Sequence, residues 1–280
     1  MEIDPQILKS ISRLLVLEYV AHIVRYGLFA GLAYLLFYVW FRRQALGRKI
    51  QAAFPKSADL RREISYSLLS FVVFCGAGLL TVTFHRLGWS HIYFKIGRYG
   101  WGYFWCSVVA LIFIHDTWFY WTHRLMHWKP LFPIFHRVHH LSHNPTPWAS
   151  FSFHPLEALV QAIIFPLAVL VLPLHPLAAV IWLAYMTFMN VVGHLGFEVL
   201  PAGFLRSRFW RWHNTSVHHN MHHRYVHFNY GLYFNIWDRL MGTNHPRYED
   251  EFAAIFPPKP SPPAPSADSE GTAPTAPRPA

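Results

Sequence analysis

The sequence predicts an all-α integral membrane protein with about four membrane-inserted helices and a cytosolic, helical, histidine-rich cap. The composition is the first reason: 53% of the 280 residues are hydrophobic, 18% are aromatic and only 14% are charged, which is too apolar for an ordinary soluble protein. The second is a series of apolar segments close to the length of about 20 residues that crosses a bilayer as a helix. The third is that 17 of the 20 histidines lie between His115 and His245.

Three segments are predicted to span the membrane as helices, at about 21–40, 64–84 and 103–121. A fourth apolar region, 156–192, is interrupted by the sequence Leu-Pro-Leu-His-Pro, so each arm has only about 16 residues, fewer than a full span. Because proline ends or kinks a helix, this region is predicted to be a helical hairpin that enters and leaves on the same side.

The charge pattern predicts the orientation in the membrane. Cytoplasmic loops carry an excess of Lys and Arg, and the loop after the first span is strongly basic. Its basic residues are Arg42, Arg43, Arg48, Lys49, Lys56, Arg61 and Arg62. Counting the spans from this loop places every histidine motif on the cytoplasmic side. Because these basic residues lie beside apolar segments, the formal charge of +10 indicates contact with a membrane surface, and no nucleic-acid partner is expected.

The chain is predicted to have three parts. Residues 1–102 hold the N-terminal membrane helices and the basic loop, and residues 103–250 form the catalytic domain. Residues 251–280 form a Pro/Ala-rich tail that lacks apolar surface to bury and is expected to be disordered.

Three histidine motifs have helical spacing, so the histidines within each motif are expected to share a helix face. They are His123-x-x-x-His127, His136-x-x-His139-His140 and His219-x-x-His222-His223. A lone histidine is more often a surface or core residue than a ligand, but three spaced clusters on one predicted side are not explained in that way. Eight imidazoles suffice for two metals with four nitrogens each, whereas a single zinc needs three or four.

The surrounding residues narrow the chemistry. Asp116, seven residues before His123, is predicted to accept the ring N–H of a ligating histidine. The two cysteines, Cys75 and Cys106, lie in apolar runs, so nitrogen or oxygen must hold any metal. Imidazole suits zinc, copper, iron and nickel. An open site at the membrane face, with an apolar approach, favours iron and oxygen chemistry on a lipid C–H bond.

From about Asp116 to Gly242 the chain resembles the fatty acid hydroxylase/sterol desaturase superfamily of membrane diiron proteins, and it is most similar to the sterol C-5 desaturase (lathosterol oxidase) type. The histidine motifs and the segments 119–124, 145–155 and 228–240 carry this resemblance. It implies four membrane-inserted helices under a cytosolic cap that holds two iron ions, with O2 as co-substrate.

The resemblance also implies further site residues. His194, which follows the second arm of the hairpin, is implied as a ninth ligand. Some members of the superfamily have two histidines four residues apart here, but this chain has Asn190 at the earlier position, so a tenth ligand stays unassigned and His154 or water is a candidate. His218 is turned by about 100° from His219 on a helix, so we expect it to support a ligand. Phe151 replaces a histidine that sterol desaturases tend to have, which leaves the exact substrate open.

These observations predict an O2-dependent oxidoreductase that desaturates or hydroxylates a sterol-like or acyl lipid. Because the chain has no dinucleotide, haem or iron–sulfur motif, electrons are expected from NAD(P)H through a separate reductase or electron-transfer protein. The alternatives are hydroxylation of a fatty acyl, carotenoid or amino-lipid substrate and, from another class, a metal transporter or sensor. A transporter should place ionisable residues at mid-membrane. The expected location is the bacterial inner membrane, or the endoplasmic reticulum of a eukaryote.

Overall fold

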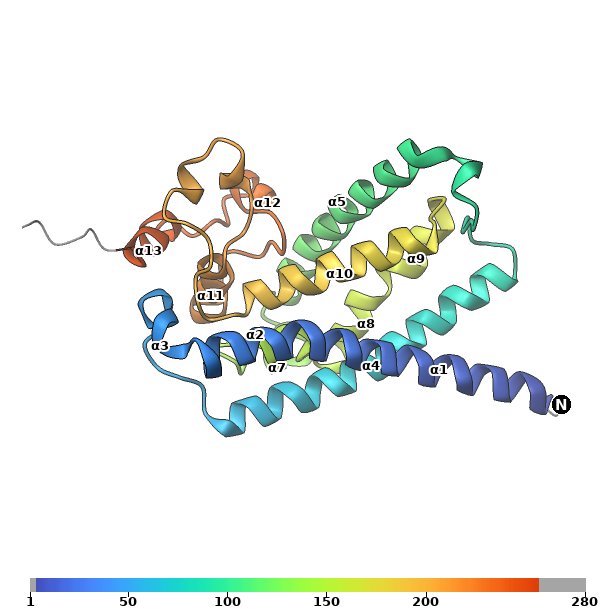
Figure 1. Ribbon diagram of the computed structural model, residues 1–280, viewed down its shortest axis with the longest axis horizontal. Helices are drawn as coiled ribbons and strands as arrows, with labels where there is room; N and C mark the ends of the chain where they lie inside the picture. The colour runs from blue at the N-terminus through green and yellow to red at the C-terminus, as the bar shows by residue number, and fades with distance from the viewer. Residues whose placement is uncertain (1–3, 257–280) are drawn as a thin grey trace, which may run out of the picture.

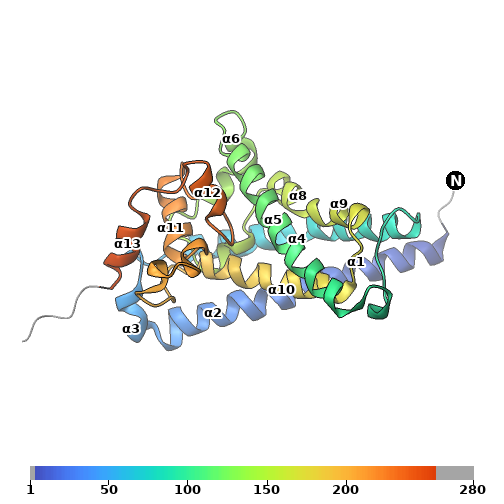
Figure 2. The same cartoon turned by 90° about the horizontal axis from the view of Figure 1, so that it is seen from above.

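The computed structural model describes residues 4–256, whose regular structure is helical (Figure 1). The longest helices lie side by side, and short helices gather at one end of them (Figures 1 and 2). The α-helices are α1 (Pro5–Tyr26), α2 (Leu32–Tyr34), α3 (Arg42–Ala45), α4 (Ser57–Arg86), α5 (Gly100–Met126), α6 (Phe132–Phe135), α7 (Arg137–His140), α8 (Pro155–Ala162), α9 (Ile164–Val171), α10 (Pro176–Gly193), α11 (Ser216–Tyr225), α12 (Ile236–Leu240) and α13 (Tyr248–Ala254).

Seven further short helical segments connect these helices. The π-helical segments are η1 (Gly27–Gly31) and η2 (Leu35–Trp40). The 3-10 segments are η3 (Leu46–Arg48), η4 (Ile96–Arg98), η5 (Pro147–Phe151), η6 (Phe204–Arg206) and η7 (Trp210–Trp212).

The first helical rod is longer than the sequence predicts. It runs without a break over Pro5–Trp40, through α1, η1, α2 and η2, whereas the predicted span begins at about residue 21. Its early start has a local cause, because Asp4 caps the helix by accepting the backbone N–H of Gln6 at 2.8 Å and a proline occupies the first helical position.

Four helical rods are long and apolar enough to cross a membrane, which confirms the predicted fold class. They are Pro5–Trp40, Ser57–Arg86, Gly100–Met126 and Pro176–Gly193. The predicted hairpin is also confirmed, since α8 and α9 lead away from the cap and α10 returns toward it (Figure 1). As a result, the C-terminal ends of α5 and α10 both lie against the short helices of the cap.

The cap extends past the predicted domain boundary at residue 250. Helix α13 continues to Ala254, and its Tyr248 and Phe252 are buried against Val217 and Met221 of α11. Burial of these side chains fixes the helix, so residues 251–254 belong to the cap and not to a disordered tail. The rest of the predicted tail, from residue 257, lies outside the described residues.

Candidate metal centre

Nine buried histidines converge where the membrane helices meet the cap. His123 lies in the last turn of α5, while His127 and His194 directly follow the last residues of α5 and α10. The others belong to the segment around α7 and to α11. They form two groups: His123, His127, His136, His140 and His222 in one, and His139, His194, His219 and His223 in the other.

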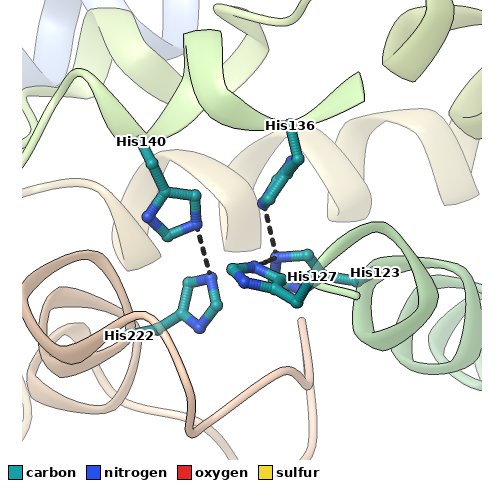
Figure 3. A group of neighbouring side chains, drawn as sticks. All are labelled: His123, His127, His136, His140 and His222. Carbon is teal, nitrogen blue, oxygen red and sulfur yellow. Dashed lines mark hydrogen bonds between the residues drawn. The ribbon is translucent and has the colours of Figure 1, made fainter. Parts of the chain in front are cut away.

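In the five-histidine group, several Nε2 atoms lie close to one another (Figure 3). His123 Nε2 lies 2.9 Å from that of His136 and 3.3 Å from that of His127. His140 Nε2 lies 3.0 Å from that of His222. These nitrogens therefore face one small volume contributed by three separate chain segments.

The four-histidine group is centred on His194. Its Nε2 atom lies 3.0 Å from that of His219 and 3.2 Å from those of His139 and His223. The two groups are neighbours, because the ring centroids of His140 and His223 are 5.0 Å apart. Each group could hold a metal ion, so the two candidate metal sites are adjacent.

The two His-x-x-His-His motifs are divided between the two groups, a feature that the sequence analysis did not predict. His136 and His140 turn to the five-histidine group while His139 turns to the other, and His222 is likewise separated from His219 and His223. On a helix, residues four apart differ by only about 40° in direction, and the residue between them in the motif points elsewhere. With His194 included, the nine histidines lie in groups of five and four.

In these rings Nδ1 is the outer nitrogen, which points away from the group, and Nε2 is the inner one. The hydrogen bonds of the outer nitrogens show that the inner nitrogens suit a metal. Nδ1 of His194 donates to Asn190 O at 2.7 Å, and Nδ1 of His139 to Ser152 O at 3.4 Å. A neutral imidazole that donates from Nδ1 presents a lone pair at Nε2. Burial lowers the pKa of His194 to about 4 and that of His139 well below its usual value, so both rings are neutral. Lone pairs 3.2 Å apart repel each other unless a cation lies between them, so the residues fit a metal ion.

The five-histidine group uses the same arrangement. His123 Nδ1 donates to Tyr230 O at 2.8 Å, and His222 Nδ1 donates to Phe228 O at 2.6 Å. Asp238 fixes this segment by accepting the backbone N–H groups of Tyr230 and Gly231, both at 2.8 Å. The segment 228–231, which follows the last histidine triplet, therefore orients the rings of His123 and His222 from outside the group.

The segment that contains all nine histidines matches a known family. Residues 108–243 match the family model described as fatty acid hydroxylase. This segment is therefore similar to the fatty acid hydroxylase family. The match begins in α5 and ends after α12, so α1 to α4 lie outside it.

The relatives that the chain matches include proteins named as a sterol oxidase and a sterol desaturase. It is 36% identical to lathosterol oxidase of Mus musculus over 57% of this chain and 52% of that protein. It is 31% identical to the Delta(7)-sterol 5(6)-desaturase of Schizosaccharomyces pombe over 59% of this chain and 53% of that protein. The chain thus spans about half the length of these curated relatives. No solved structure gives a significant match.

The role expected of Asp116 needs correction. Its carboxylate accepts the backbone N–H groups of Tyr233, at 2.8 Å, and Phe234, at 3.3 Å, instead of a histidine ring N–H. Seven residues separate Asp116 from His123, which is about 10 Å along the helix and too far for direct contact. Asp116 therefore holds the backbone at Tyr233 and Phe234 in place.

Glu157 places a carboxylate beside the ring nitrogen of a candidate ligand, which is the role that was expected of Asp116. One of its carboxylate oxygens lies 2.7 Å from Nδ1 of His136, and both side chains are buried. The sequence analysis missed this residue, although a lone carboxylate in an apolar segment was a usable signal. A carboxylate at the outer nitrogen fixes the ring orientation and raises the basicity of the inner nitrogen.

We expect Glu157→Gln to weaken metal binding by about 10- to 100-fold while the protein stays folded. The amide keeps the size of the side chain but replaces the carboxyl group that lies beside His136. Metal affinity of the detergent-purified protein measures the effect, with circular dichroism as the check on folding. Unchanged affinity would show that the carboxylate does not support this ligand.

The remaining predicted residues lie outside both groups. His154 caps α8, where its Nδ1 accepts the backbone N–H of Leu156 at 3.3 Å. His218 is fully buried, with its Nε2 atom 3.7 Å from Asp238. Asn190 donates its side-chain amide to Ser150 O at 2.5 Å, and its own carbonyl orients His194. Asn190 thus contacts His194 of the four-histidine group, and His218 lies beside Asp238, which fixes the segment at Tyr230. No described contact joins His154 to either group.

An apolar cavity of about 310 Å³ lies between the membrane helices and the histidines. Two of its lining residues contact the groups directly: the ring of Phe119 is 4.9 Å from that of His123, and the ring of Phe153 is 5.2 Å from that of His139. α1, α4, α5, α8, α9 and α10 all contribute to its wall. A hydrophobic molecule in this cavity therefore reaches the edge of the candidate metal centre.

Proposed function

We propose that this protein is a membrane-bound, iron-dependent oxidoreductase that uses O2 to desaturate or hydroxylate a lipid. The observation that carries the proposal is an apolar cavity whose lining residues Phe119 and Phe153 contact the two adjacent groups of buried imidazoles. The relatives named as lathosterol oxidase and sterol desaturase favour a sterol-like substrate over an acyl one. Transport and sensing are less well supported, because neither explains a lipid-sized cavity beside the histidines.

The residues of the chain have separate tasks in this reaction. Nine histidines hold two iron ions through Nε2, and Glu157 with the carbonyls of Tyr230 and Phe228 fixes the ring planes. Bound iron supplies the electron-transfer chemistry that reduces O2. The rings of Phe119 and Phe153 exclude water and hold the lipid carbon near the centre.

The electron balance requires a partner. Hydroxylation places one oxygen atom of O2 in the lipid and desaturation removes two hydrogens from it; each also consumes two external electrons and forms water. We propose that NAD(P)H supplies them through a separate electron-transfer protein, which docks on the basic loop where Arg42, Arg43 and Arg61 are exposed. We place this loop and the cap on the cytoplasmic side of a bacterial inner membrane, or of the endoplasmic reticulum in a eukaryote.

Metal analysis and lipid mass spectrometry test the proposal together. Detergent-purified protein is expected to hold close to two irons per chain, and expressing cells to contain a lipid that is heavier by one oxygen or lighter by two hydrogens. Growth without O2 should remove the product and leave the iron. Absence of bound metal after iron-replete, reducing expression would refute the dinuclear assignment.

A further inference from the structure

The apolar cavity carries a polar patch made of Glu18 and Arg25 of α1 and Gln161 of α8. Glu18 Oε2, Arg25 Nε and both amide atoms of Gln161 are buried, and none has a hydrogen-bond partner within residues 4–256. Each buried polar atom without a partner lowers stability, because the loss of its hydration is not offset by a hydrogen bond. A ligand that satisfies these atoms would recover this free energy, so the patch is suited to binding a polar group.

The Glu18 end of the patch lies away from the two histidine groups. The Glu18 carboxylate packs directly against Gly78 of α4. Ser70 of the same helix donates to the carbonyl of Phe153, whose ring contacts His139. Eight residues separate Ser70 from Gly78, which is about 12 Å along the helix. A lipid can thus contact the patch with one end while another part of it lies at the metal centre.

The chemistry of the patch selects a neutral polar group. Glu18 and Arg25 carry opposite charges and form no ion pair with each other in the described chain, so together they leave no net charge for an ionic head group. A carboxylate or phosphate would be repelled by the like charge of Glu18, and an ammonium group would be repelled by that of Arg25. A hydroxyl group both donates and accepts a hydrogen bond, as this mixture of atoms requires.

We propose that Glu18, Arg25 and Gln161 bind the hydroxyl end of the lipid substrate. This inference rests on the proposed function of the cavity. Glu18 and Arg25 precede residues 108–243, so part of the substrate selection is assigned to a helix outside the family match. Arg25 is positioned for this role by a 2.8 Å hydrogen bond from its Nη2 atom to His22 Nδ1.

Paired alcohols and methyl ethers test the proposal by equilibrium binding to the iron-loaded, detergent-purified chain. The probes are lathosterol and hexadecanol, each compared with its methyl ether, which accepts but cannot donate a hydrogen bond. The wild type is expected to bind the alcohol of at least one pair about tenfold more tightly than the ether. Gln161→Leu is expected to bring this ratio close to one, with the affinity for the ether unchanged.

Two glycines of α4 supply a matched pair of variants. A Cβ atom at Gly78 would collide with the Glu18 carboxylate, whereas one at Gly76 meets nothing within 4 Å. Because the collision involves the flexible end of a side chain, Gly78→Ala should displace the carboxylate while the helix stays intact. The preference for alcohol is expected to fall in Gly78→Ala and to persist in Gly76→Ala.

The outcomes separate this inference from the proposed function. Equal binding of alcohol and ether by the wild type, a preference that survives Gln161→Leu, or no binding of either pair would overturn the hydroxyl site. Iron content measured on the same samples decides the rest: two irons per chain with no preference refutes the hydroxyl site alone, while missing iron counts against the oxygenase.

Discussion

His139→Ala is expected to remove the iron held by the four-histidine group and to lower lipid turnover by more than 100-fold, above the effect of about 10–100-fold that is usual for losing a supporting partner. Its Nε2 atom is 3.2 Å from that of His194, and only three imidazoles would remain in that group. His222→Ala leaves four imidazoles in the other group, so its loss of iron should be smaller. Iron per chain and product formation in the same cells measure both effects.

His143→Ala is the matched control, because His143 is exposed and belongs to neither group. It should keep the iron content and turnover of the wild type. If His139→Ala retained both irons, the division of the histidines into two metal-binding groups would be wrong.

Ala162→Trp is expected to reduce lipid turnover by at least 100-fold while the iron content stays near that of the wild type. Ala162 lines the cavity, and an indole there would occupy much of its volume of about 310 Å³. Overpacking of this kind typically costs about 1–3 kcal/mol of stability, which the rest of the fold should tolerate. Product formation, with iron per chain on the same preparation, distinguishes a blocked cavity from a damaged metal centre.

The control is Ala253→Trp, on the exposed face of α13 and outside the cavity. It introduces the same side chain and should leave turnover unchanged. Normal turnover by Ala162→Trp would show that the lipid reaches the histidines by another path.

Features that depend on the local sequence were predictable. Apolar length identified the membrane helices, and the Leu-Pro-Leu-His-Pro interruption predicted the hairpin that returns at α10. The spacing of the three motifs, together with the resemblance that added His194, named all nine histidines that the structure brings together. The length of an apolar run and the spacing of a motif are both read along the chain, without knowing what each helix packs against.

Other features depended on contacts between distant segments. Glu157 meets His136 because α8 packs against the segment around α7, and Asp116 instead meets the chain at Tyr233, more than 100 residues away. The division of each triplet between two groups, and the polar patch shared by α1 and α8, also require the assembled helices. The sequence by itself therefore determined the membrane helices and the ligand types, because those follow from composition and spacing. Only the tertiary structure decided which partners orient the ligands and where a lipid can lie, because these are set by packing between segments that no local pattern encodes.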